Sequence, residues 1–413
     1  MTASPSHAVP KLVAQIARMM VQHPMGDLIV EQVDGRRIRV GGGHWLTDFA
    51  SCNYLGLDLD PEVQDALPGY LARWGTHPSW ARMIASPALY QQVETDVRDL
   101  LGVEDVLAFP SLTHTHFGVL PALAGDGTLL VDLRAHRTMH DAAALARAGG
   151  AKVRRFRHND LEHAARLLRE ATRSPRIICI DGINSMTGNP PDLPAFAELA
   201  REHDALLYVD DAHGFGVVGE RSGYDSSPLG RRGNAVVRYF GESYDSILLT
   251  AGFSKAYSSM LAFVACPSPL KRYLKVVVPS YSYSGPVPVA SLAAALLGLQ
   301  VNERRGDELR AQLYQKAKVL LDHVDKLGVA CDNVSGFPLV ELALADPADL
   351  DAVGQHLYER GIFVTLTPHP IVPRDEVGFR IQVTVANTLE QLETLNVVLS
   401  EVDERFGFRR PHP

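Results

Sequence analysis

The stretch Leu206-Leu207-Tyr208-Val209-Asp210-Asp211-Ala212-His213-Gly214 decides the fold class of this chain. Its first four residues predict a strand that is covered on both faces, and the charged residues and glycine that follow end the strand. A second apolar run, Ile247-Leu248-Leu249-Thr250, precedes Lys255 in the same way. Two such strands, paired in parallel, would present Asp210 and Lys255 at the same edge of a sheet.

A carboxylate and an amine at neighbouring strand ends can hold opposite ends of one aromatic aldehyde cofactor, and the cofactor that we infer is pyridoxal phosphate. Lys255 would form an imine with the aldehyde. Asp210 would keep the pyridine nitrogen protonated, so that the ring can accept electrons from a carbanion. The plainer alternatives are a solvated surface lysine and a helix-capping aspartate.

Short apolar runs alternate with helical segments from about residue 105 to 266, which predicts an α/β fold with a mainly parallel, doubly wound, seven-stranded sheet. Ligands of such sheets bind beyond the carboxyl ends of the strands, where Asp132 and Asp181 also fall. The seven predicted strands are 106–109, 129–131, 153–156, 177–180, 206–209, 247–249 and 262–265.

We expect three parts in the chain: an N-terminal arm (1–46), a large cofactor-binding domain (47–290) and a smaller C-terminal α+β domain (291–413). Within the arm, residues 11–22 have the apolar spacing of an amphipathic helix, and 27–50 are typical of a hairpin that turns at Asp34-Gly35.

A long helical stretch from about 287 to 328 leads into the C-terminal domain. There the pattern predicts strands at 338–344, 362–366 and 379–385. A helix follows the capping box Thr388-x-x-Gln391.

The composition favours small-molecule chemistry. The chain has 413 residues, a net charge of −8 and no run of lysine and arginine, which argues against nucleic acid or an anionic membrane as a partner. Its four cysteines lack metal-ligand spacing and are expected to be reduced thiols. No apolar stretch approaches the roughly 20 residues of a membrane span, and without an address signal the expected location is the cytoplasm.

Six segments, taken in this order, resemble the α-oxoamine synthases, which are pyridoxal-phosphate enzymes of the aspartate-aminotransferase fold (fold type I). These enzymes join an acyl thioester to an amino acid. The Thr-Ala-x-x-x-Lys segment at Lys255 is most similar to the branch that makes bacterial amino-ketone autoinducers. The segments are Asn53–Leu57, Asp132–His136, Ile183–Gly188, Val209–Gly214, Thr250–Lys255 and Gly378–Ile381.

The resemblance implies roles for several polar residues around the cofactor ring. Asp210 would face the pyridine nitrogen while His213 reaches the ring phenolate. His136 would stack on the ring, although His140, one helical turn later, could be confused with it. Ser185 would contact the phenolate side, its alternative being a turn hydroxyl.

The segment Ser111-Leu112-Thr113 is the candidate phosphate site, because it precedes a helix whose N-terminal N–H groups favour an anion. The family usually has glycine and an aromatic residue where this chain has Leu112 and Thr113. It also usually has serine or threonine where this chain has Gly252, and glycines where this chain has Ser258 and its neighbours. These departures reshape the pocket.

Arg380 lies in an apolar strand, where a guanidinium needs an anion; the resemblance implies a substrate carboxylate, and an internal Asp or Glu is the alternative. Cys52 stands where the family tends to have an asparagine near the substrate.

The implied activity is that of an acyltransferase (EC 2.3.1.-). Lys255 would remove the α-proton of an amino acid docked on Arg380, with His136 at the developing oxygen. The carbanion would attack an acyl thioester of coenzyme A or a carrier protein and release its thiol. Loss of carbon dioxide from the acylated amino acid would then give an α-amino ketone. The alternatives are an aminotransferase, a carbon–carbon lyase or a non-catalytic pyridoxal-phosphate-binding protein. The resemblance also implies a homodimer in which residues 281–286 reach the neighbouring site.

Overall fold

The computed structural model describes residues 23–223 and 227–411. The amphipathic helix predicted at 11–22 lies outside the described residues. Internal contacts divide the chain into two units, one made of residues 52–314 and the other of residues 1–51 together with 315–413. Helix α11 (Val289–Lys326) runs from the first unit into the second. Within the described ranges, no helix is both long and apolar enough to cross a membrane.

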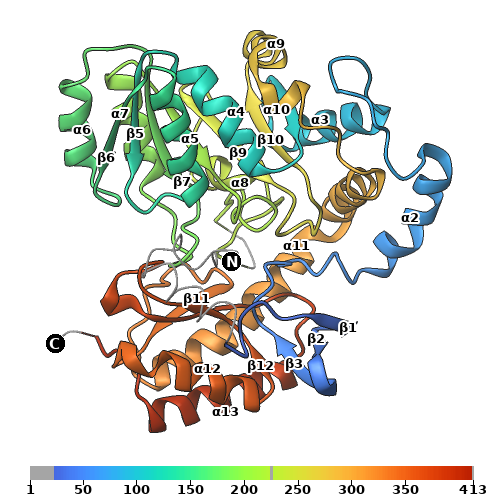
Figure 1. Ribbon diagram of the computed structural model, residues 1–413, viewed down its shortest axis with the longest axis vertical. Helices are drawn as coiled ribbons and strands as arrows, with labels where there is room; N and C mark the ends of the chain where they lie inside the picture. The colour runs from blue at the N-terminus through green and yellow to red at the C-terminus, as the bar shows by residue number, and fades with distance from the viewer. Residues whose placement is uncertain (1–22, 224–226, 412–413) are drawn as a thin grey trace, which may run out of the picture. The chain divides into compact units, whose positions relative to one another are not determined.

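The unit of residues 52–314 is built on the predicted seven-stranded sheet (Figure 1). The strand order is β4-β10-β9-β8-β7-β5-β6, and every neighbouring pair is parallel except those of β10, which runs antiparallel to both β4 and β9. The seven strands are β4 (Asp105–Phe109), β5 (Thr128–Asp132), β6 (Lys152–Phe156), β7 (Arg176–Asp181), β8 (Ala205–Asp210), β9 (Ile247–Gly252) and β10 (Ala262–Cys266).

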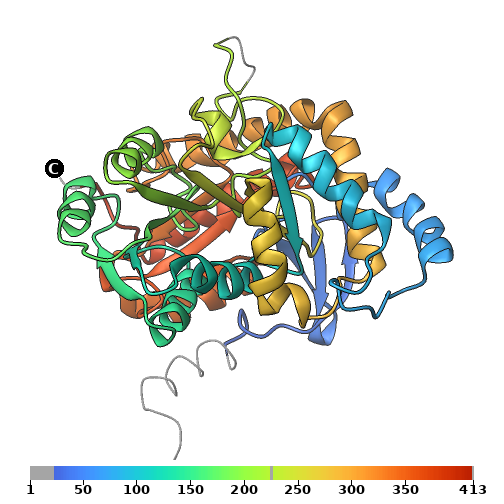
Figure 2. The ribbon, with the colours of Figure 1, turned by 90° about the horizontal axis from the view of Figure 1, so that it is seen from above.

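Helices lie on both faces of this sheet (Figure 2). Helices α4, α5, α9 and α10 share one apolar core with the strands, whereas α6 and α7 pack together on the other side. The helices of this unit that precede α11 are α2 (Pro61–Trp74), α3 (Ala88–Leu101), α4 (Leu112–Ala124), α5 (Arg137–Ala148), α6 (Leu161–Arg169), α7 (Leu193–Glu202), α8 (Ala235–Tyr239), α9 (Ser268–Val277) and α10 (Pro279–Ser282).

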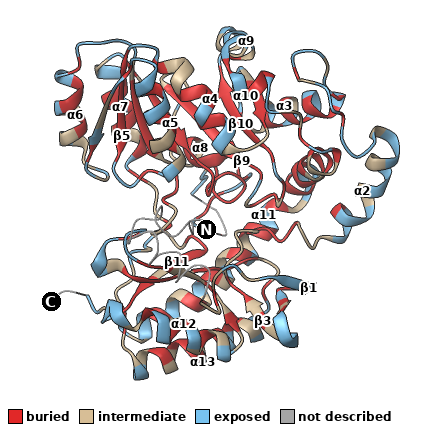
Figure 3. Cartoon of the chain, viewed as in Figure 1, coloured by how far each residue is buried: buried red, intermediate tan, exposed pale blue. Residues whose placement is uncertain are grey.

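The continuous apolar runs are buried as predicted. Every residue of β5, β9 and β10 is buried, which Figure 3 shows as red strands between the helices. β6, at the edge of the sheet, is buried only at Phe156. Strands covered on both faces tolerate few polar side chains, so the polar residues collect where the strands end.

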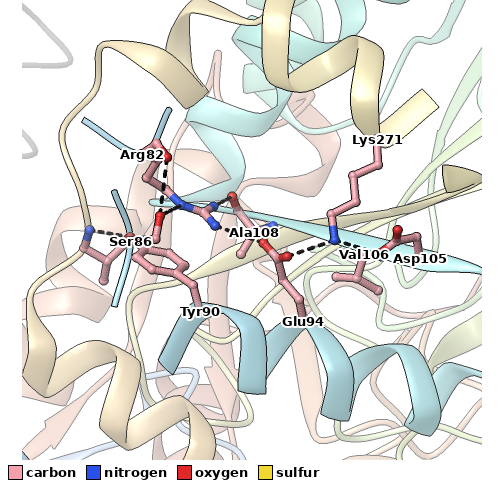
Figure 4. A network of polar contacts seen from close by, with 9 residues as sticks. Arg82, Ser86, Tyr90, Glu94, Asp105, Val106, Ala108 and Lys271 are labelled. Atoms are coloured by element: carbon pink, nitrogen blue, oxygen red, sulfur yellow. Dashed lines mark hydrogen bonds and ion pairs between the residues drawn. The ribbon is translucent and has the colours of Figure 1, made fainter. Parts of the chain in front are cut away.

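A buried polar network fixes β4, the strand that leads to the Ser111 loop (Figure 4). The Arg82 guanidinium lies 3.8 Å from the centroid of the Tyr90 ring, donates to the Ala108 carbonyl and forms an ion pair with Glu94 at 3.0 Å. Glu94 also accepts from the Ala108 N–H and pairs with Lys271 at 2.9 Å. Both hydrogen-bonding groups of Ala108 are thus held by side chains of a compensated ion pair.

The second unit contains two small sheets. The predicted hairpin is present as β1 (Val30–Asp34) and β2 (Arg37–Val40), and β2 pairs with β3 (His44–Asp48). β3 in turn pairs in parallel with β12 (Ile362–Phe363). The three-stranded antiparallel sheet has the order β11 (Leu339–Ala343), β14 (Gly378–Gln382) and β13 (Thr365–Thr367).

One prediction for this unit was wrong. Residues 362–366 do not form a single strand, because β12 pairs with β3 while β13 pairs with β14, and the buried Val364 separates them. The capping box of Thr388 and Gln391 is confirmed at the start of α13 (Leu389–Arg405). The remaining described elements of this unit are η2 (Gly41–Gly43), η3 (Pro347–Asp349), α12 (Leu350–Glu359) and η4 (Arg374–Glu376).

Candidate active site

Asp210 and Lys255 line the same cavity, which has a volume of about 440 Å³. β8 and β9 pair in parallel with Asp210 opposite Thr250, so the carboxylate ends one strand and the lysine follows the next. The cavity lies within the unit of residues 52–314, and all eight residues predicted to bind the cofactor border it. Its lining is Asn53, Ser111, Leu112, Thr113, His136, Thr138, Asp181, Ile183, Ser185, Asp210, Ala212, His213, Ser254, Lys255, Ser258, Ser259 and Met260.

An aromatic cluster packs the segment after β8 against the segment that contains Lys255. Phe215, two residues after His213, packs on Phe253 and Tyr257, which lie on either side of Lys255 in the chain. The centroid of the Phe215 ring lies 5.4 Å from that of Phe253 and 4.9 Å from that of Tyr257. Gly216 has a φ of +86°, and a Cβ atom there would lie 2.7 Å from the Ala256 Cβ. The turn after β8 therefore needs glycine to pack against the lysine segment.

Three carboxyl groups meet at the ends of β7 and β8, but they are not equivalent. Burial and the neighbouring Asp210 raise the pKa of Asp181 well above its usual range. Burial raises the pKa of Asp211 to about 7. Burial also opposes ionisation of Asp210, but the charge and hydrogen bond of His116, aided by His136 and Lys255, lower its pKa to about 2. Asp210 is therefore the most acidic of the three carboxyl groups.

His116, on α4, is a site residue that the sequence analysis missed. Its imidazole is fully buried, with Nε2 at 2.9 Å from Asp210 Oδ2 and Nδ1 at 2.8 Å from the Tyr208 hydroxyl. The other carboxylate oxygen, Asp210 Oδ1, accepts a hydrogen bond from the Ala212 N–H at 3.0 Å. The only local signal was a histidine amid the apolar residues of a helix, which does not identify its partner.

The predicted ring contacts His213 and Ser185 both border the cavity. The Nδ1 atom of His213 lies 2.8 Å from the hydroxyl of Tyr54, which is fully buried and fixes the orientation of the imidazole. Tyr54 belongs to the Asn53–Leu57 segment, but the sequence assigned it no role. Asn53 also lines the cavity and donates to Asp58 at 3.0 Å.

His136, rather than His140, borders the cavity. It is the N-cap of α5 and its Nδ1 atom lies 2.7 Å from the Thr138 hydroxyl, while its backbone N–H donates to Asp181. Burial lowers the pKa of His140, and Arg155 lowers it further. The hydrogen bonds of His136 to Thr138 and Asp181 hold this residue at the cavity wall, beside the end of β7.

The Ser111 segment begins α4, as predicted. The Ser111 hydroxyl is the N-cap and accepts from the His114 N–H, and the residues 111–113 line the cavity. The first-turn N–H groups of a 13-residue helix thus lie at the cavity, which suits an anion.

Leu112 and Gly252, two of the departures from the usual family sequence, lie next to each other. A Cβ atom at Gly252 would lie 3.2 Å from Leu112 Cδ1 and 3.4 Å from its Cγ. The leucine therefore occupies the room that a larger residue at 252 would need. Ser258 keeps a positive φ of 51°, a conformation that glycine adopts with less strain.

Arg380 and Cys52 are not among the residues that border this cavity in the described chain. Arg380 lies in β14 of the other unit, opposite Glu341 in the sheet register. With the Gln382 amide nitrogen donating to the Phe49 carbonyl, the amide oxygen accepts two hydrogen bonds from Arg380, each of 2.9 Å. Cys52, which precedes Asn53 in the chain, is half-buried and belongs to no disulfide.

Comparison with known proteins gives the family. The model for aminotransferase class I and II matches residues 50–397. The chain is 30% identical to 8-amino-7-oxononanoate synthase of Chromobacterium violaceum, with 92% of each chain covered, and 33% identical to that of Sodalis glossinidius, with 89% and 90% covered. The chain belongs to the α-oxoamine synthases of the class I and II aminotransferase family. The family predicted from the motifs is confirmed.

Solved structures of serine palmitoyltransferases share the fold. Serine palmitoyltransferase of Sphingomonas wittichii superposes with a TM-score of 0.85 at 22% identity, covering 95% of this chain and 96% of that one. A serine palmitoyltransferase variant from S. paucimobilis, with a bound PLP–myriocin aldimine, superposes with a TM-score of 0.86 at 21% identity and the same coverage. The predicted fold type I is confirmed.

The contact between positions 112 and 252 makes a prediction for stability. Gly252→Thr should lower the free energy of unfolding by about 1–3 kcal/mol, because the new side chain overlaps Leu112. Adding Leu112→Ala removes the carbons that it meets, so the double variant should lose less than the sum of the two single variants. Urea unfolding of all four proteins measures this coupling, and strictly additive losses would contradict it.

Proposed function

We propose that this chain uses pyridoxal phosphate to join an amino acid to an acyl thioester. The observation that carries the proposal is that Lys255, the ionised Asp210 and the N-terminus of α4 border one cavity. The α-oxoamine synthases named above, which resemble this chain along nearly its whole length, support the same chemistry.

The donor set suits each part of the cofactor. Lys255 supplies the amine for the aldehyde and Asp210 the carboxylate for a protonated ring nitrogen. The N-terminus of α4, with Ser111 and Thr113, supplies N–H and hydroxyl groups for the phosphate. A buried Asp181 oxygen at the cavity has no hydrogen-bond partner among the described residues, as expected of a site that takes a polar ligand.

When bound, pyridoxal phosphate supplies an electron sink for a carbanion at the α-carbon of the amino acid. Asp210 keeps that sink effective by holding a proton on the ring nitrogen. His136 and His213, with Ser185, orient the ring. The Lys255 amine moves the α-proton, and Arg380 binds the substrate carboxylate in the fork geometry of a guanidinium.

In the second half of the reaction, His136 donates a hydrogen bond to the acyl oxygen as the new carbon–carbon bond forms. The thiol of the thioester leaves, and loss of carbon dioxide from the amino acid gives an α-amino ketone. Cys52, beside Asn53, replaces an amide with a thiol near the substrate. The sequence Thr250-Ala251 before Lys255 favours the branch of the family that makes amino-ketone signals.

Lys255→Ala should abolish covalent attachment of the cofactor and reduce turnover below detection, because no other amine borders the cavity in the described residues. Borohydride reduction followed by peptide mass spectrometry locates the attachment, and thiol release measures turnover with a panel of amino acids and thioesters. Lys152→Ala, on the exposed end of β6, is the matched control and should retain both.

Full turnover by the Lys255→Ala variant would end the proposal. Amino-group transfer to a 2-oxo acid, without consumption of thioester, would instead identify an aminotransferase. Absence of α-proton exchange with every amino acid would favour a non-catalytic binding protein.

Arg380→Ala should raise the KM for the amino acid by about tenfold to a hundredfold, since a hydrogen bond to a charged group contributes roughly 1.5–3 kcal/mol. Steady-state kinetics at saturating thioester measures this. Arg374→Ala, exposed in η4 of the same unit, should leave the KM unchanged. An unchanged KM in Arg380→Ala would assign the arginine a structural role within its own unit, where Gln382 is one of its partners.

The working form is proposed to be a homodimer in which residues 281–286 reach the neighbouring site. Tyr283 is 83% exposed and Val276, nearby on α9, is 76% exposed, which is typical of a surface that another chain covers. Light scattering should give twice the mass of one chain, and Tyr283→Ser together with Val276→Ser should shift the protein towards monomer. A monomeric, fully active wild type would contradict this.

A further inference from the structure

We propose that His116 is a positioning residue that reserves the negative charge of the site for Asp210, and so sets the protonation of the cofactor ring nitrogen. The inference rests on the proposed function, because it concerns the group that Asp210 would face. His116 matches no role in the sequence motifs. It acts through Asp210 rather than on the cofactor itself, since it does not border the cavity.

The carboxyl groups at the ends of β7 and β8 compete for ionisation. Asp181 and Asp210 are direct neighbours in the β7–β8 register, and Asp211 follows immediately in the chain. Asp210 and Asp211 are buried. Neighbouring carboxyl groups in a medium of low dielectric constant do not all ionise, because their negative charges repel one another. The structure must therefore select which group carries the charge.

Of these three groups, the one that His116 hydrogen-bonds is Asp210. Its Nε2 atom lies 2.9 Å from Asp210 Oδ2 and both side chains are buried, at 0% and 5% exposure. His136 and Lys255 also favour the ionised form of Asp210. Lys255 acts on Asp181 and Asp211 as well, whereas the hydrogen bond of His116 is made to Asp210.

The hydrogen-bond geometry also fixes the direction of the carboxylate. Asp210 Oδ1 accepts from the Ala212 N–H and Oδ2 accepts from His116, so each oxygen retains a lone pair for a further donor. The Tyr208 hydroxyl holds the other imidazole nitrogen at 2.8 Å. Tyr208, His116 and Asp210 thus form a chain of buried groups that ends at the cavity wall.

The test uses two cofactors with apo-protein: pyridoxal phosphate and its analogue in which C–H replaces the ring nitrogen. If His116 acts through Asp210 on the ring nitrogen, His116→Gln and His116→Phe should weaken binding of pyridoxal phosphate by about tenfold or more. The same variants should bind the analogue as the wild type does, because the analogue has no ring N–H. Tyr208→Phe should produce a smaller change in the same direction.

Val119→Ala is the matched control. Val119 is fully buried on α4, one turn after His116, and faces the apolar core rather than Asp210. Its loss perturbs the helix packing, so any effect on affinity should be the same for both cofactors. A second readout is the ¹⁵N chemical shift of ring-labelled pyridoxal phosphate, which should report a protonated nitrogen in the wild type and loss of the proton in His116→Phe.

Preferential loss of pyridoxal phosphate affinity, with the change in ¹⁵N shift, supports the proposal. Equal losses for both cofactors, or an affinity ratio within about twofold of the wild type in His116→Gln, would overturn it. If His116→Phe does not fold, His116→Gln decides, since it retains an N–H donor and removes the imidazole. Failure of the wild type to bind pyridoxal phosphate would refute the proposed function instead.

Discussion

The parallel pairing of β8 with β9 is the constraint on which the site depends. It sets Asp210 opposite Thr250, so that a carboxylate and an amine reach one cavity from adjacent strands. The packing of Phe215 on Phe253 and Tyr257 makes this pairing rigid beyond the strand ends. The apolar scaffold therefore fixes where the backbone presents both groups, and hydrogen bonds from His116 and the Ala212 N–H orient the Asp210 carboxylate.

The order of the sheet strands follows no simple sequence rule, yet the strands themselves were predictable. Continuous apolar runs such as 247–249 and 262–265 have few other stable placements than a sheet covered on both faces. The break between β12 and β13 was not predictable, because it depends on which distant strand each half joins. Pairing partners far away in the chain decide such cases.

The same distinction holds for the site. Residues within contiguous motifs, such as Asp210 and His213, could be proposed from the sequence, and they lie at one cavity. His116 could not, since its partner Asp210 is 94 positions away and α4 meets β8 only in the folded chain. The Leu112 and Gly252 exchanges looked like two separate departures from the family until their contact was visible. Membership of the family therefore predicts the chemistry of the site better than it predicts which side chains line the cavity.

The placement of β10 has a consequence for biosynthesis. β4 is an edge strand whose single neighbour in the sheet is β10, and Ala108 pairs with Phe263, which is translated much later. While the ribosome is making the intervening chain, β4 has no strand to join, and its apolar residues stay without their final cover. Completion of the sheet is thus a late event of synthesis, and the nascent chain is open to aggregation or chaperone capture until residue 266 has emerged.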